Sequence, residues 1–201
     1  MKLTLVRCLI IAFFLGLGSF SGVAHGMEFF AKGAYSKTYN SSDSFTTRIT
    51  ATAGTAIKIF PRLRVDVRYT NISSLQNRLN IVTTTAVGTI SDLKTVTEIA
   101  SVGIDINILG DKSRFQPFIL VGAGYIVDER SYFFNLSGET DAVFIQEPKS
   151  TEVTGNVGAG FKIILTSSMA FEVEVFAYGL DIDKPNPRVN IYGNVGIRFF
   201  L

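Results

Sequence analysis

Residues 189–201 read V-N-I-Y-G-N-V-G-I-R-F-F-L. The odd-numbered positions of this stretch are almost all apolar, whereas most even-numbered positions are polar or glycine. An alternation of period two is typical of a β-strand with a different environment on each face. In a water-soluble protein, an apolar strand at a sheet edge would invite pairing with other chains. The stretch therefore predicts the closing strand of a barrel, with lipid on its apolar side and a polar lumen on the other.

The same alternation recurs along the rest of the chain. The predicted strands cover residues 28–37, 45–60, 63–70, 93–108, 115–125, 151–165, 169–178 and 189–201. Short turns at 61–62, 110–113 and 166–168 alternate with longer connections, as short periplasmic turns and longer extracellular loops do in outer-membrane barrels. The sequence therefore predicts an all-β protein, an eight-stranded antiparallel up-and-down transmembrane β-barrel. An even number of strands places both termini in the periplasm.

Residues 1–26 differ in kind from the remainder. Lys2 and Arg7 precede and flank an apolar run over residues 8–17, and small residues follow it. This run is too short for a membrane-spanning helix and is typical of a cleaved secretory signal peptide. Cleavage is expected after Ala24 or after Gly26. The predicted domains are thus a signal peptide, 1–26, and an outer-membrane β-barrel domain, 27–201.

Removal of the signal peptide changes the charge of the protein. The 19 basic residues lose Lys2 and Arg7, and the remaining 17 equal the 17 acidic residues. A neutral chain gives no support for nucleic-acid binding. The single Cys, Cys8, leaves with the signal peptide, and the single His, His25, leaves with it or becomes terminal. We therefore expect no disulfide, no metal site built on thiolate or imidazole, and no cofactor.

Aromatic residues give an independent indication of the membrane. They gather near both ends of the predicted strands, as the interfacial girdles of a membrane barrel require. The girdle predicted at the periplasmic side consists of Phe29, Phe60, Phe115, Phe171 and Phe199, and the opposite girdle of Tyr35, Phe45, Tyr69, Tyr125 and Tyr178. A soluble sandwich or lipocalin-like barrel in the periplasm is the alternative fold, because alternation alone fits both.

Three stretches resemble the small outer-membrane β-barrel family of the OmpA/OmpX type. They are Q-P-F-I-L-V-G-A-G-Y at 116–125, G-A-G-F-K at 158–162, and a C-terminal assembly signal formed by Asn194, Gly196, Phe199 and Leu201. The family usually ends on Phe, so Leu201 is a departure. The resemblance implies residence in the outer membrane among its lipids and lipopolysaccharide, and recognition of the last strand by the barrel-insertion machinery. It specifies a fold rather than a function.

Charged residues on the predicted inner face are the candidate functional residues. An eight-stranded barrel is only wide enough for its own side chains, so these charges must pair. They form either a plug or a gated ion path in which pairs such as Arg198 and Glu172 exchange partners. The predicted lumen network comprises Lys32, Arg48, Lys58, Arg64, Asp66, Arg68, Asp105, Glu152, Lys162, Glu172, Glu174 and Arg198.

The two longest connections, residues 71–92 and 128–149, are the remaining candidate surface. The second is acidic and carries aromatic residues, so it could contact a host protein, another cell or lipopolysaccharide. Alternatively, both connections extend their strands beyond the membrane. Glu172 and Glu174 share a strand face but no recognisable cleft, so we expect no enzyme. The predicted function is a structural or surface-interaction role with a plugged lumen, and the alternative is a small-solute or ion channel.

Overall fold

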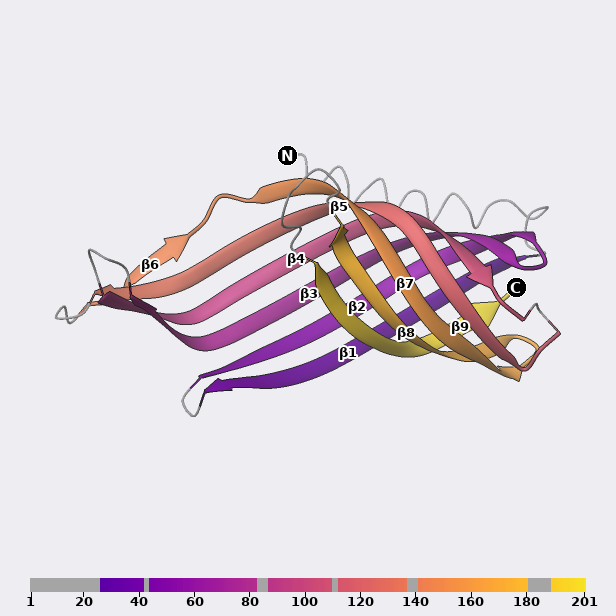
Figure 1. Ribbon diagram of the computed structural model, residues 1–201, viewed down its shortest axis with the longest axis horizontal. Helices are drawn as coiled ribbons and strands as arrows, with labels where there is room; N and C mark the ends of the chain where they lie inside the picture. The colour runs from indigo at the N-terminus through magenta and orange to yellow at the C-terminus, as the bar shows by residue number, and fades with distance from the viewer. Residues whose placement is uncertain (1–25, 42–43, 83–86, 110–111, 137–140, 181–188) are drawn as a thin grey trace.

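The computed structural model describes residues 26–41, 44–82, 87–109, 112–136, 141–180 and 189–201, which form one closed antiparallel sheet (Figure 1). Its strands are β1 (Met27–Ser41), β2 (Ser44–Phe60), β3 (Leu63–Val82), β4 (Val87–Asn107), β5 (Phe115–Leu136), β6 (Val143–Gln146), β7 (Ser150–Thr166), β8 (Met169–Leu180) and β9 (Asn190–Phe200). All except β6 form the barrel wall. The predicted all-β fold with eight antiparallel up-and-down strands is confirmed. No helix within the described ranges is long and apolar enough to cross a membrane.

The barrel closes between its first and last strands. β9 pairs with β1 from Glu28–Phe200 to Gly33–Val195, and with β8 along its other edge. The closing strand thus pairs with the first strand of the barrel and with the strand that precedes it in the sequence. Gly196 lies where β1 and β9 approach closely, because a Cβ atom at this position would stand 2.1 Å from the Ala31 carbonyl oxygen. The predicted signal peptide falls almost wholly on residues 1–25, outside the described residues.

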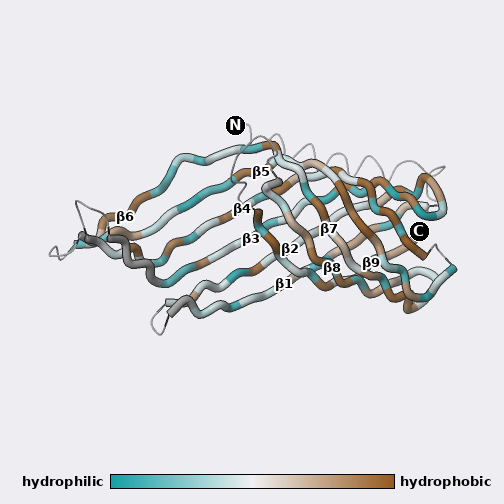
Figure 2. The backbone as a smooth tube through the Cα atoms, in the orientation of Figure 1, coloured by the Kyte–Doolittle hydropathy of each residue, from teal (hydrophilic) through white to brown (hydrophobic). Residues whose placement is uncertain are grey.

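Apolar side chains cover the outer face of the barrel. On β4, the outward residues Val102, Ile104 and Ile106 are each 44–52% exposed, while Ser101 and Asp105, which face the other way, are buried. Figure 2 shows that hydrophobic residues are concentrated in the cylinder rather than in the part of the sheet that extends from it. This inversion, with apolar residues outside and charges inside, fits a barrel surrounded by lipid.

The assignment of Tyr178 to the predicted aromatic girdle is wrong. It stands at a strand end, but its side chain is only 7% exposed and lies inside the barrel with Tyr192. Its even number gives it the same inward direction as Phe176 on β8, and this alternation overrides its position near the end of the strand. Aromatic residues that do face outward on β5 include Phe115, where the strand begins, and Tyr125, ten residues further along.

One arc of the wall continues far beyond the rest. β3, β4 and β5 extend at the end opposite the short turns, and β6 pairs with the tip of β5 from Ser131–Gln146 to Phe134–Val143 (Figure 1). We call this part of β3, β4, β5 and β6 the sheet extension. Interpreting residues 71–92 and 128–149 as loops is therefore wrong for most of their length, and the alternative of extended strands is confirmed. Polar β-branched residues such as Thr suit an exposed strand as well as a loop.

Candidate functional site

Within the described part of the chain, ten charged side chains fill the lumen at the end that carries the short turns. Each of these residues is at most 5% exposed. Five are basic and five acidic, so the buried set is neutral. They are Lys32, Arg64, Arg68, Lys162 and Arg198, with Glu28, Asp66, Asp105, Glu172 and Glu174. We call this set the charged layer. Neutrality matters here because an unpaired buried charge costs several kcal/mol.

Arg198 joins the two strands that close the barrel to their neighbour β8. Its Nε donates to Glu172 Oε2 at 2.6 Å, and its Nη1 donates to Glu28 Oε2 at 2.8 Å. The Nη2 group lies 3.9 Å from a carboxylate oxygen of Asp66 and from one of Asp105. A planar guanidinium with five donors can serve several carboxylates at once, which suits arginine to this central position.

Lys32 and Arg68 bind the second carboxylate of β8. The Lys32 ammonium donates at 2.6 Å to both Glu172 and Glu174, across β9, which lies between their strands. Arg68 donates at 2.7 Å to Glu174 and at 2.7 Å to Asp66 on its own strand. Both glutamates therefore accept from two cations each, so both carboxylates on this face of β8 are occupied by ion pairs.

The remaining members complete the layer. Lys162 on β7 donates to Asp105 on β4 at 2.6 Å, across β5. Arg64 donates to Glu28 at 2.5 Å. Contacts between strands that are not adjacent run through the lumen rather than along the wall. The layer consequently ties opposite sides of the barrel together.

Three residues of the predicted network lie outside the charged layer. Lys58 and Glu152 are exposed, and Arg48 is half-buried. Each has the inward parity of its strand, but each stands near an end of the barrel, where water is accessible. Glu28 is the member that the prediction missed. Its signal was available, because Glu28 has the same parity as Lys32 on the same strand.

Aromatic rings pack against the cations of the charged layer. Arg198 lies 4.5 Å from the ring centroid of Phe30, and Lys162 lies 4.6 Å from that of Phe118. Arg68 lies 5.1 Å from the Phe176 ring. Cations at such distances are attracted to the ring faces, and more strongly when water is excluded. The rings thus exclude water from the charged layer and also attract its cations.

Toward the sheet extension, an apolar cluster that includes Phe176 occupies the lumen. Phe176 and Tyr192 stack with centroids 5.3 Å apart, and Tyr178 meets Tyr192 at 5.7 Å. We call the cluster the apolar layer. Its members, each at most 7% exposed, are Ile72, Ile99, Leu120, Ile126, Phe176, Tyr178 and Tyr192. An ion that crossed the barrel would have to pass both layers, and no member of the second carries an ionic charge.

The four residues of the predicted C-terminal signal divide between the two faces of β9. Asn194 is buried in the lumen, and Gly196 allows the close approach of β1. Phe199 and Leu201 point outward and are 48% and 66% exposed. The polar and glycine positions therefore have roles within the barrel wall, while the two apolar positions present a surface that another protein or lipid can contact.

Among the described residues, no group of three or more His, Cys, Asp or Glu side chains is arranged to hold a metal ion. The buried carboxylates of the charged layer instead face ammonium and guanidinium groups. The charged layer therefore fills this part of the lumen with ion pairs.

Comparison with solved structures places the architecture in a class. Neisserial surface protein A is similar with 17% identity and a TM-score of 0.52, covering 88% of this chain and 97% of that one. The N-terminal β-barrel domain of Pseudomonas aeruginosa OprF has 11% identity and a TM-score of 0.46, covering 88% and 98%. Acinetobacter baumannii CarO has 14% identity and a TM-score of 0.48, covering 88% and 98%. The chain has the fold of the small eight-stranded outer-membrane β-barrels. No family model and no curated protein sequence matches it.

Proposed function

We propose that this chain is an integral protein of a bacterial outer membrane, closed by its own side chains, which acts at the cell surface through its sheet extension. The proposed role is non-catalytic. Support for the membrane location comes from the outer wall, where residues such as Ile104 and Val121 are exposed while Asp105 and Lys162 are buried. A water-soluble barrel would require the opposite arrangement.

The observation that carries the proposal is that two layers of side chains, the charged layer and the apolar layer, fill the lumen. The charged layer is neutral and paired, so a passing ion would have to displace ion pairs such as Lys162–Asp105. The apolar layer has no comparable set of charges with which to replace the hydration shell of an ion. Because the two layers lie in series, opening one of them would leave the other closed.

The orientation follows from the unequal ends of the barrel. In the proposed arrangement, the sheet extension faces the outside of the cell, as the longer connections of outer-membrane barrels do. The short turns and both ends of the barrel domain then face the periplasm. Trypsin added to intact cells should cut at Lys149, an exposed residue between β6 and β7 next to the extension. Cleavage only after the outer membrane is permeabilised would contradict this orientation.

Planar-bilayer recording of the refolded protein tests the closed lumen. We expect no discrete conductance steps from the wild-type barrel, with a general porin in the same bilayers as the positive control. Discrete openings of the wild-type protein would overturn the proposal and favour the alternative of a small-solute or ion channel.

Exposed aromatic residues on the extension support the surface role. Phe133 on β5 and Phe144 on β6 are 41% and 56% exposed, and their ring centroids lie 5.3 Å apart. An exposed pair of this kind suits contact with an apolar patch of another molecule. Replacing both with Ser should lower the attachment of expressing bacteria to host cells several-fold, whereas Tyr39→Ser, on the opposite arc, should not. Equal attachment of all three strains would contradict the surface role.

A further inference from the structure

Two hollows lie one above the other on the outer wall of β4 and β5. Outward residues of these strands are in register, with Glu98 opposite Val127, Ala100 opposite Tyr125, and further pairs on either side. The upper hollow lies where the wall becomes the sheet extension, and the lower hollow lies on the apolar part of the cylinder. The two hollows therefore form one continuous surface of changing polarity.

Tyr125 marks the level at which the wall leaves the membrane. Phe115 and Tyr125 are ten residues apart on β5 and both face outward. Ten residues at about 3.3 Å each, tilted by about 40°, rise about 25 Å, which is the height of the apolar band of an outer-membrane barrel. The lower hollow thus faces acyl chains, and the upper hollow faces lipid headgroups.

The lower hollow is an apolar groove of about 400 Å³. Its width results from small residues in adjacent strands, Ala100, Ala123 and Gly124. Tyr125 and Val153 stand at its sides, 41% and 74% exposed. A groove of this kind on a wall surrounded by lipid is suited to one acyl chain, because an acyl chain fills a narrow apolar space that bulkier groups cannot enter.

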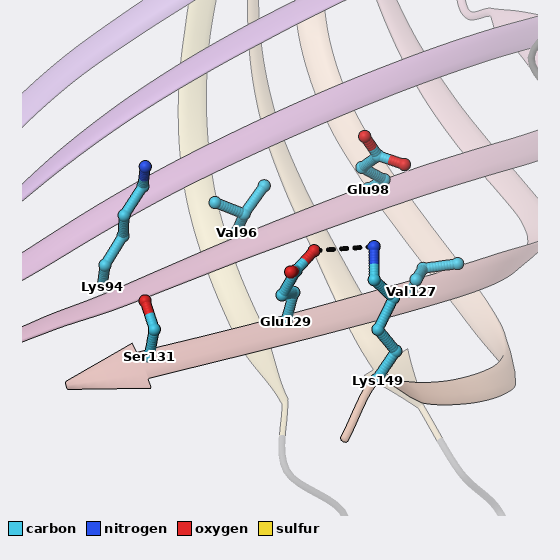
Figure 3. Close-up of a pocket in the computed structure, with 7 residues that line it drawn as sticks. All are labelled: Lys94, Val96, Glu98, Val127, Glu129, Ser131 and Lys149. Atoms are coloured by element: carbon cyan, nitrogen blue, oxygen red, sulfur yellow. Dashed lines mark ion pairs between the residues drawn. The ribbon is translucent and has the colours of Figure 1, made fainter. Parts of the chain in front are cut away.

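The upper hollow is a polar pocket of about 220 Å³. Figure 3 shows Lys94 and Lys149 at its two edges with Glu129 between them. Lys149 contacts Glu129 at 2.8 Å, and Gln146 donates to the same carboxylate at 2.9 Å. The hydrogen bond from Lys149 holds the pKa of Glu129 below its ordinary value, so this carboxylate is charged at neutral pH. Glu98 provides a second carboxylate on β4.

We propose that this wall binds one phosphorylated glycolipid of the outer leaflet, with an acyl chain in the lower hollow and its headgroup in the upper one. Lys94 and Lys149 bind phosphate oxygens, and Glu98 and Glu129 accept hydrogen bonds from sugar hydroxyl groups. A pocket that carries both charges matches a headgroup that offers both acceptors and donors. The inference rests on the proposed outer-membrane location.

Native mass spectrometry of the folded, full-length barrel domain in detergent tests the site, with bis-phosphorylated lipid A as the probe. The double variant Lys94→Gln/Lys149→Gln should weaken lipid A binding about tenfold. Lys37→Gln, an exposed lysine at the same end of β1, is the matched control and should stay within twofold of wild type. Ala123→Phe should fill the groove and also weaken binding, whereas Ala53→Phe, on the outer face of β2, should not.

The ligands used in the titration identify what is recognised. Dephosphorylated lipid A should bind about tenfold more weakly than lipid A, and the lysine variant should no longer distinguish the two. Phosphatidylglycerol should bind more weakly than lipid A, and inorganic phosphate should not compete at millimolar concentration. Equal affinity of the wild type and the lysine variant for lipid A would overturn the site, as would tighter binding of phosphatidylglycerol.

Failure of this site and failure of the proposed function remain distinguishable. The titration measures a surface of the folded barrel and does not depend on whether the lumen conducts. Discrete channel openings would therefore overturn the closed lumen and leave the lipid site standing. If Ala123→Phe does not fold, as judged by its migration on unboiled gels, the lysine variant decides the question alone.

Discussion

The charged layer and the apolar layer fill the same lumen by different physics. In the charged layer, every residue depends on particular partners, so Glu172 is held at 2.6 Å by both Lys32 and Arg198. In the apolar layer, Leu120 and Phe176 depend on volume and contact, which many hydrophobic side chains can supply. The difference teaches that one barrel interior can combine a region intolerant of single changes with a region that adapts to them.

Removal of Arg198 is expected to have the largest effect. Arg198→Ala leaves Glu172 and Glu28 with one cation fewer in a buried site, and it removes the largest side chain that is fully buried. We expect a loss of about 5 kcal/mol in the free energy of unfolding, the upper end of the range for breaking buried ion pairs. Urea unfolding in lipid vesicles, followed by circular dichroism, measures it. Arg62→Ala in an exposed turn is the control, and a comparable loss there would contradict the reasoning.

Phe176→Ala tests the apolar layer. The side chain is 1% exposed and contacts both Tyr192 and the Arg68 guanidinium. Its truncation should cost about 3 kcal/mol through lost contacts and a residual cavity. Phe176→Leu keeps most of the volume and should cost about 1 kcal/mol. If the two variants unfolded at the same urea concentration, packing volume would not be what stabilises this layer.

A paired replacement sharpens the contrast between the layers. Lys162→Met alone should lower the free energy of unfolding by about 3 kcal/mol, because it leaves Asp105 without its closest cation. Adding Asp105→Leu should recover most of this loss and leave the double variant within about 1 kcal/mol of wild type. The measurement is a double-mutant cycle of urea midpoints. A double variant that is less stable than Lys162→Met would show that the pair stabilises through its charges.

The smallest effect is expected at the surface pair Glu129–Lys149. The pKa of Glu129 is lowered in the folded protein, chiefly by the hydrogen bond from Lys149. The pair therefore contributes stability above the ordinary Glu pKa of about 4.3, and this contribution is lost as the pH falls through the lowered value. In Lys149→Gln, the Glu129 pKa should rise toward its ordinary value while the urea midpoint at neutral pH stays nearly unchanged. Carboxylate NMR titration checks the first point, and an unshifted pKa would contradict it.

Alternation along the sequence is sufficient to predict the barrel and most of its interior. It predicts all eight wall strands, because a wall with lipid outside and charges inside imposes period two on every strand. The same parity places Lys32, Glu172 and Arg198 in the lumen. Glu28 has the same inward parity, so the rule applied to every residue of the first strand also predicts Glu28 in the lumen.

The parity of a residue does not predict its height along the barrel axis. Arg48, Lys58 and Glu152 have the inward parity of the charged layer, but they lie near the ends of the wall. Their position depends on where each strand crosses the membrane, and this depends on tilt and stagger set by all the strands together. Contacts such as Lys32–Glu174 cross an intervening strand, so they depend on the curvature of the closed wall.

The position of Arg198 has a consequence for the order of folding. Its partners Glu28 and Glu172 lie 170 and 26 residues away, and they come from the two strands that flank β9. Before β1 and β9 meet, Glu28 and Arg198 have no such contact and must remain hydrated. Formation of the dry network is therefore coupled to ring closure as a late, cooperative event. A half-assembled sheet cannot bury these charges, so the pairing of β1 with β9 distinguishes completed barrels from incomplete ones.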